Sequence, residues 1–220
     1  MNFEFSSDQM LLKDQARKFL ENEESVKKAR EVLEGDQTHD ESLWRSVVEM
    51  GWTATTIPEE FDGLGLGYLE LCVIAEELGR SLAPTPFSSS VYLATEALIN
   101  QGSKEQHQKY LPKLAAGEIV GTLAHTETTS SPSPENLNCE LKNNKLNGTK
   151  IAVIDGDVAN FAVVSAKEGD KVVLGLVDLS SKGVEVTSQN TLDPSRSHAC
   201  IKFKDADAEI LGSSQDGWTA

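Results

Sequence analysis

Apolar residues in the first half of the chain recur at the spacing of amphipathic helices. A first helix is predicted to begin after Ser6, because the Ser6 hydroxyl and the Gln9 side chain fit a capping box. Its apolar residues share one face: Leu12, Ala16, Phe19 and Leu20. A second helix is expected after Asp40, which can cap its first turn, and Gly51 is placed to end it.

Three further helices are predicted before residue 118. The first lies within Tyr68–Arg80 and ends at Gly79, and the second is a short apolar helix over Ser90–Ile99. The third follows a capping box that begins at Ser103. Pro112 is expected to end or kink this last helix, because proline has no backbone N–H to donate.

From residue 119 onward the pattern changes to that of β-strands. Ala199, Ile201 and Phe203 alternate with more polar neighbours, which is typical of a half-buried strand. Asn143-Asn144 stands where a hairpin turn is expected. The chain is therefore predicted to be an α+β protein. A helical domain over residues 1–118 precedes a small antiparallel β-barrel or sandwich domain over residues 119–220.

Composition and charge narrow the class of protein. The formal net charge of -15 argues against binding to nucleic acid or to an anionic membrane surface. The chain shows neither a secretory signal nor an apolar run of membrane-spanning length. Cys72, Cys139 and Cys200 are widely separated, so a reducing compartment is expected and a metal site is not.

Short motifs alone reveal no catalytic group. The chain contains neither the GxGxxG nor the P-loop pattern for nucleotide phosphates, and Gly63–Gly67 ("GLGLG") is interpreted as a loop entering a helix. The acidic pairs Glu59-Glu60 and Glu76-Glu77 lie in charged contexts that favour solvated faces. The four histidines do not pair at metal-binding spacings.

Four segments in series resemble the acyl-CoA dehydrogenase family. They are a proline-acidic-glycine loop with its following helix (Ile57–Arg80), a helix with Tyr-Leu-Pro and a Gly-Glu exit (Gly102–Glu118), a strand ending in Thr-Glu (Leu123–Glu127), and a Leu-Asn-Gly-x-Lys strand (Leu146–Asn160). The resemblance implies an N-terminal helical domain and a middle β-domain. The C-terminal helical domain of the family is absent from this chain.

The resemblance also implies an activity. Family members are oxidoreductases of fatty acid and lipid metabolism that use FAD to remove hydrogens from Cα and Cβ of an acyl-CoA. A carboxylate base takes the α proton while flavin N5 accepts the β hydride. In most members the base belongs to the C-terminal helical domain, so no catalytic residue is assigned here.

Partners and compartment follow from the same resemblance. The expected partners are an acyl-CoA substrate, electron-transfer flavoprotein or a similar acceptor, and further subunits in a homo- or hetero-oligomer. A bacterial protein of this kind is expected in the cytoplasm, and a eukaryotic one in the mitochondrial matrix or peroxisome.

Transferred by position, Leu123, His125 and Thr126 would lie beside the flavin ring, with the Thr126 hydroxyl able to bond its polar edge. The alternative for Thr126 is a hydroxyl that bonds its own backbone at the end of a strand.

The family's Pro-Gly-Ala-Gly-Ser-Asp loop corresponds to Thr128–Ser133, where both glycines are missing. Ser131 and Pro132 are then the implied cofactor contacts, and Ser131 and Ser133 the implied acyl-CoA contacts. Pro132 offers neither an N–H nor a hydroxyl.

A second departure lies on the following strand. Where the family has Trp-Ile-Thr beside the flavin, this chain has Ala152, Val153 and Ile154. Losing the aromatic contact at Ala152 would cost about 0.5–1.5 kcal/mol beyond area burial. Placing Ile154 near N5 would cost a further ~1–3 kcal/mol if a polar flavin atom is left buried without a partner.

These departures leave three hypotheses. The chain is part of an FAD-dependent acyl-CoA dehydrogenase, or it is a non-catalytic, FAD-deficient partner subunit of a heteromeric one. A β-domain that binds acyl-CoA or lipid without redox chemistry is a third interpretation.

Overall fold

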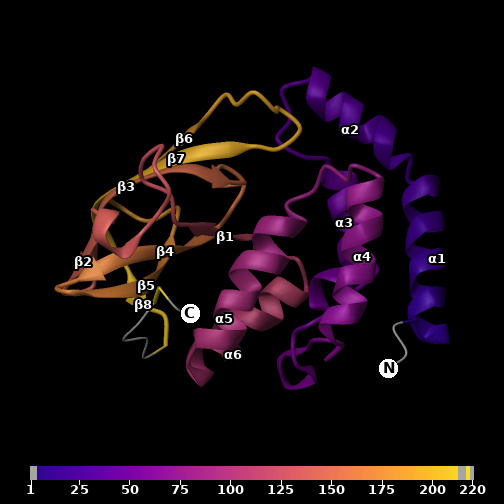
Figure 1. Cartoon of the computed structure of the whole chain (residues 1–220), viewed down its shortest axis with the longest axis horizontal. Coiled ribbons are helices and arrows are strands. Elements are labelled where there is room, and N and C mark those ends of the chain that lie inside the picture. Colours follow the sequence, from indigo (N-terminus) through magenta and orange to yellow (C-terminus); the bar gives the residue numbers. More distant parts are fainter. Residues whose placement is uncertain (1–3, 213–216, 219–220) are drawn as a thin grey trace.

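The structure is a computed structural model that describes residues 4–212 and 217–218. Helices occupy its first part and strands its second (Figure 1). The helices are α1 (Ser7–Asn22), α2 (Ser25–Glu34), α3 (Glu41–Glu49), η1 (Trp52–Ala54), η2 (Glu59–Phe61), α4 (Tyr68–Arg80), η3 (Ser88–Thr95), α5 (Glu96–Gln101), α6 (Lys104–Ala115) and η4 (Pro134–Asn136). The strands are β1 (Gly121–Ala124), β2 (Glu140–Lys142), β3 (Lys145–Ile154), β4 (Phe161–Glu168), β5 (Lys171–Asp178), β6 (Val184–Ser188), β7 (His198–Asp207) and β8 (Glu209–Ile210).

Local signals place most helix ends where the sequence predicts them. Capping boxes at Ser6 and Ser103 begin α1 and α6, and the Asp40 carboxylate accepts a hydrogen bond from the Leu43 N–H (2.7 Å) at the start of α3. Gly51 follows α3 in the left-handed conformation, with φ +75°.

Two helix predictions are wrong in detail. Helix α6 does not end at Pro112 but continues to Ala115, because Leu111 and Leu114 on either side of the proline are buried and hold the last turn against the core, whereas a kink at Pro112 stays a prediction. The short helix predicted over Ser90–Ile99 is a π-helix, η3, which passes into the α-helix α5.

The strands form one curled sheet in the order β6-β7-β3-β2-β4-β5-β8, and β1 pairs with β4 (Figure 1). This confirms the predicted fold class. Most pairs are antiparallel, but β1 and β2 run parallel to β4, so the sheet is mixed. The predicted Asn143-Asn144 turn joins β2 to β3, with φ of +53° and +58° at its two residues.

Helices and sheet share a hydrophobic core. Leu98 of α5 and Leu111 of α6 pack in one cluster with Phe161 and Val163 of β4. The change from helix to strand falls between Ala115 and Gly121. Since this cluster draws on both parts, a domain boundary at residue 118 stays a prediction.

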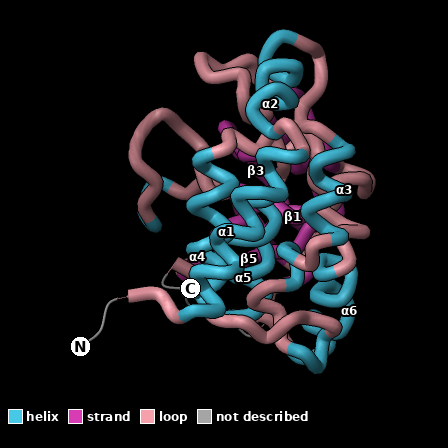
Figure 2. The backbone as a smooth tube through the Cα atoms, turned by 90° about the vertical axis from the view of Figure 1, so that its right-hand side faces the viewer, coloured by secondary structure: helices cyan, strands magenta, loops and turns pink. Residues whose placement is uncertain are grey.

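Helices α1 and α4 lie side by side on the face that points away from the sheet (Figure 2). An ion pair joins them, because the Arg17 guanidinium binds the Glu77 carboxylate at 2.7 Å. Glu77 is buried, so the prediction of a solvated face is wrong for this residue, whereas Glu76 is exposed. The pairing with Arg17 is what lets a carboxylate occupy an interior position.

Within residues 4–212 and 217–218, no helix combines the length and the apolar character that crossing a membrane requires.

Gly121 tests the contact between helix and sheet. A Cβ atom there would lie 2.5 Å from Ala94 Cβ of η3 and 2.6 Å from Phe161 Cζ. We expect Gly121→Ala to lower the free energy of unfolding in urea by about 1–3 kcal/mol through overpacking.

Gly79→Ala is the matched control, because Gly79 lies in α4 with no heavy atom within 4 Å of the added Cβ. It should stabilise the protein by about 0.5–1 kcal/mol. A Gly121→Ala variant as stable as the wild type would contradict this contact.

Candidate functional site

The two groups of predicted flavin contacts lie on neighbouring segments. The Ile151 N–H donates to the Thr126 carbonyl (2.8 Å), and the Thr122 hydroxyl donates to the Ile154 carbonyl (2.6 Å). These two bonds join the segment of Leu123, His125 and Thr126 to that of Ala152 and Ile154. The structure thus brings these five residues to one junction, which we name the β1–β3 junction. Their contact with a flavin stays a prediction.

A β-bulge shapes the strand at Ala152. The pairing of β3 with β7 shifts between Lys150 and Val153, and Ala152 adopts a left-handed backbone with φ +50°. Its side chain is exposed, and its N–H donates to the Gln189 side-chain oxygen (2.8 Å). The bulge turns Ala152 outward while Val153 remains buried in the sheet interior.

The end of β3 is anchored to the helical part by a buried acid. The Asp155 carboxylate accepts a hydrogen bond from the Ser89 hydroxyl of η3 (2.6 Å). Burial raises the pKa of Asp155, although the Ser89 bond opposes this effect. This contact fixes Ile154, the preceding residue, close to the seam between helices and sheet.

Lys150 is fully buried beneath the junction. Its ammonium lies 2.8 Å from the Glu127 carboxylate, 3.1 Å from the Ser165 hydroxyl and 3.2 Å from the His125 carbonyl. An ammonium has three N–H groups, so each of them has an acceptor here.

Glu127 completes the buried pair. Its carboxylate also accepts backbone N–H bonds from Cys139 (3.0 Å) and Asn138 (2.5 Å). Burial alone would raise the pKa of Glu127, but the bonds from Lys150 and from these two amides outweigh it and lower the pKa to about 2. Glu127 is therefore ionised at neutral pH.

His125 is half-buried rather than on the surface. Its Nδ1 atom is 3.0 Å from the Ser165 hydroxyl, and its ring centroid lies 4.9 Å from that of Trp218. Burial lowers the pKa of His125, and the nearby Lys150 ammonium lowers it further, so the ring is neutral at pH 7. Residues 4–212 and 217–218 contain no cluster of histidine, cysteine and acidic side chains suited to a metal ion.

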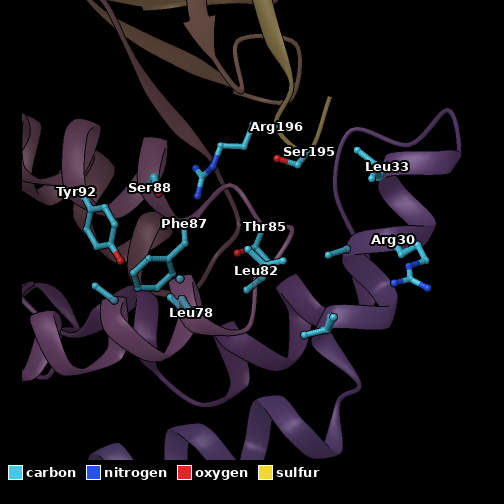
Figure 3. A pocket seen from close by; sticks show the side chains of 15 residues that line it. Arg30, Leu33, Leu78, Leu82, Thr85, Phe87, Ser88, Tyr92, Ser195 and Arg196 are labelled. Atoms are coloured by element: carbon cyan, nitrogen blue, oxygen red, sulfur yellow. The ribbon is translucent and has the colours of Figure 1, made fainter. Parts of the chain in front are cut away.

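Two cavities share Tyr92 in their walls. One, of about 330 Å³, is lined by Leu123 and His125 of the junction together with Trp218 and Tyr92. The other, of about 510 Å³, lies between α2, α4 and the start of η3 and is also lined by Tyr92 (Figure 3). We name them the junction cavity and the helical cavity.

The helical cavity is largely apolar. Its wall includes Leu78, Leu82 and Phe87, and Arg196 reaches in from the loop before β7 (Figure 3). Tyr92 packs edge-to-face on Phe87, with ring centroids 5.3 Å apart, and burial raises the pKa of its hydroxyl to about 12. Such walls suit an alkyl chain.

The remaining predicted contacts lie in the loop between β1 and β2. Ser131 and Pro132 are exposed and Ser133 is half-buried just before η4. None of the three belongs to the lining of the junction cavity or the helical cavity. Their roles toward FAD and acyl-CoA stay predictions.

Sequence reasoning missed the Lys150–Glu127 pair and Tyr92. Lys150 had a recognisable signal, since it is a charged residue directly before the apolar run Ile151–Ile154. Tyr92 had none, because its place between two cavities depends on how η3 packs against α4 and the sheet.

Comparisons with known proteins agree with this architecture. A family model described as "Acyl-CoA dehydrogenase, N-terminal domain" matches residues 6–118. The chain is 37% identical over 134 residues to the mitochondrial isovaleryl-CoA dehydrogenase of Solanum tuberosum, covering 58% of this chain and 32% of that protein. The corresponding protein of Arabidopsis thaliana is 32% identical over 173 residues, covering 76% and 42%. The chain thus spans less than half the length of these relatives.

Solved structures share the fold. The ChsE4–ChsE5 complex from Mycobacterium tuberculosis contains a chain with a TM-score of 0.82 at 25% identity, covering 99% of this chain and 58% of that one. An acyl-CoA dehydrogenase from Bacillus anthracis complexed with FAD gives a TM-score of 0.83 at 24% identity, covering 97% and 38%.

The variant Glu127→Gln tests the buried Lys150–Glu127 pair through the pH dependence of the free energy of unfolding. The pKa of Glu127 is 4.5 without the fold and about 2 within it, so the stability it contributes is present above about pH 5 and lost as the pH falls toward 2. This contribution is on the order of 3 kcal/mol at pH 7. We expect Glu127→Gln to reduce the free energy of unfolding by roughly that amount at pH 7, and by much less at pH 3.

Urea unfolding at both pH values measures this difference. Glu140→Gln, on an exposed position of β2, is the control and should shift stability little at either pH. A Glu127→Gln effect that is equal at pH 7 and pH 3 would contradict an ionised, buried Glu127.

Proposed function

Because the chain belongs to the acyl-CoA dehydrogenase family, we propose that it forms the flavin- and acyl-binding part of an FAD-dependent acyl-CoA dehydrogenase. The reaction is α,β-dehydrogenation of an acyl-CoA thioester, with FAD as the hydride acceptor. The observation that carries the proposal is that the junction cavity and the largely apolar helical cavity lie on either side of one shared wall residue, Tyr92. A substrate whose reacting carbons lie at the β1–β3 junction would extend its acyl chain into apolar surroundings.

The junction fits a flavin ring, with fewer contacts than the family pattern provides. Ala152 is exposed, so its surface leaves room for a flat ring, and Leu123 offers an apolar contact from the neighbouring segment. We expect the Thr126 hydroxyl to form a hydrogen bond with the polar edge of this ring. When bound, FAD supplies the hydride acceptor.

The chain's own side chains would bind and orient the substrate and would exclude water from the site. Leu123 and Ile154 are apolar and would keep water from the reacting carbons, which strengthens hydrogen bonds at the site. The helical cavity would hold the acyl chain. No residue is assigned as the catalytic base, and the base is expected from the C-terminal helical domain of the family.

A second candidate function is a non-catalytic, FAD-deficient partner subunit. Two observations favour it: the Ala152 N–H is already bonded to Gln189, and Ile154 has no hydroxyl to offer a flavin nitrogen. The similarity to a chain of the ChsE4–ChsE5 complex supports assembly with other subunits. In either case the proposed partners are an acyl-CoA, electron-transfer flavoprotein or a similar acceptor, and further subunits. The proposed compartment is the cytoplasm, or the mitochondrial matrix or peroxisome of a eukaryote.

The double variant Ala152→Trp/Ile154→Thr distinguishes the two functions. Restoring the aromatic contact and the hydroxyl should lower the Kd for FAD roughly tenfold or more, since about 1.4 kcal/mol corresponds to a factor of ten. Titration of the purified chain with FAD, followed by flavin fluorescence, measures this change. Thr149→Trp, on an exposed position of the same strand, is the control and should leave the Kd unchanged.

The colour of the purified protein and the reduction of its flavin by an acyl-CoA decide between the two candidate functions. A wild-type protein that is yellow, and whose flavin an acyl-CoA bleaches when the protein is produced together with the family's C-terminal helical domain, supports the enzyme. A protein that stays colourless with excess FAD, yet joins a yellow complex with a sister subunit, supports the partner subunit. An unchanged Kd in the double variant would contradict the placement of the flavin at Ala152 and Ile154.

A further inference from the structure

Two consecutive residues of β3 hold three consecutive residues after β1. The Lys150 ammonium donates to the His125 carbonyl (3.2 Å), the Ile151 N–H donates to the Thr126 carbonyl (2.8 Å), and Lys150 also binds the Glu127 carboxylate (2.8 Å). The Thr126 hydroxyl takes no part in these bonds. The backbone on both sides of Thr126 is therefore fixed while its side chain remains available.

The same ammonium fixes the ring of His125 through Ser165. The Ser165 hydroxyl lies 3.1 Å from Lys150 Nζ and 3.0 Å from His125 Nδ1. Ser165 belongs to β4, which runs beside β1, so the ring is held by a strand independent of β3. Lys150 thus controls both the carbonyl and the imidazole of His125.

Burial makes this arrangement rigid. The Lys150 side chain has no exposed surface and that of Glu127 is 7% exposed, so water cannot replace a lost partner easily. Glu127 extends the arrangement to the next strand, since the Asn138 and Cys139 amides bind its carboxylate just before β2. Breaking one contact would leave a buried charge without its partner.

We propose that Lys150 is a positioning residue for the flavin site: it does not touch the cofactor, but it holds His125 and Thr126 in the geometry that faces it. This inference rests on the proposed function. A lysine suits the role because its three N–H donors match three acceptors: the His125 carbonyl and the Glu127 carboxylate after β1, and the Ser165 hydroxyl of β4. A methionine would fill similar space and supply no donor.

The test separates positioning from stability. Lys150→Met alone leaves Glu127 buried without its partner and is expected to destabilise the fold. The double variant Lys150→Met/Glu127→Gln removes both charges, and the glutamine oxygen can still accept from the Asn138 or the Cys139 amide, so it should recover much of the stability. It still lacks the donor to the His125 carbonyl.

We expect the folded double variant to bind FAD at least about tenfold more weakly than the wild type and to show a shifted flavin absorption band. Lys202→Met is the matched control, because Lys202 is an exposed lysine on the neighbouring strand β7. It should change neither the Kd nor the spectrum. A folded double variant with wild-type affinity and spectrum would overturn the proposal.

A second readout needs no cofactor. Amide hydrogen exchange of the 125–128 segment should be faster in the double variant than in the wild type and in Lys202→Met. A wild type that binds no FAD would defeat the proposed function, and the exchange measurement would then decide alone whether Lys150 holds this segment. Unchanged protection of residues 125–128 would overturn the positioning role in that case.

Discussion

Strands β4 and β5 are buried on both faces, and the arrangement of the rest of the molecule depends on this constraint. Phe161 and Val163 point toward the helices, whereas Ala162 and Val164 point into the curled sheet. A strand of this kind cannot be stable beside water on either side, so α5 and α6 must cover one face and β3 and β7 must close over the other. The candidate functional site lies where the helices on one face approach the strands on the other.

The helix–sheet contact also explains the shape of the cavities. Gly121 lets η3 approach β1 so closely that no side chain fits between them. Tyr92, two residues before Ala94 on η3, lines both the junction cavity and the helical cavity. The position of η3 therefore shapes the wall of both cavities.

Sequence patterns predicted the elements well wherever the signal was local. Ser6, Asp40 and Ser103 cap helices through bonds to residues three positions away, and the Asn143-Asn144 turn needs only its own backbone. Such features depend on few atoms, so they can be predicted without knowledge of the tertiary structure.

Predictions failed where burial decided the outcome. The course of α6 past Pro112 depends on contacts made by its flanking leucines, and the burial of Glu77 depends on Arg17, which is 60 residues away in sequence. In the candidate site, the expectation that Thr126 lies near Ala152 and Ile154 came from a family resemblance rather than from either segment alone. The buried partner of Lys150 was not foreseen.

The features that match the family pattern and those that depart from it occupy different environments. Lys150 and Glu127 are buried within the fold, whereas Ala152 and Pro132 are exposed. A change at a buried charged residue affects stability by several kcal/mol in general, while a change at an exposed position usually costs less than about 0.5 kcal/mol. The fold can therefore retain its interior while its surface loses contacts with a cofactor.

It follows that the two candidate functions make different use of the same interior. In a partner subunit that has lost FAD, the Lys150–Glu127 pair would serve stability alone, and the orientation of Thr126 would have no ligand to face. In an enzyme, the same pair orients His125 and Thr126 toward the flavin, and the missing contacts at Ala152 and Ile154 must be offset by others at the junction. Trp218, whose ring packs on that of His125, is an aromatic residue that could make such a contact. Which of the two functions the chain performs therefore depends on the exposed residues around the buried Lys150.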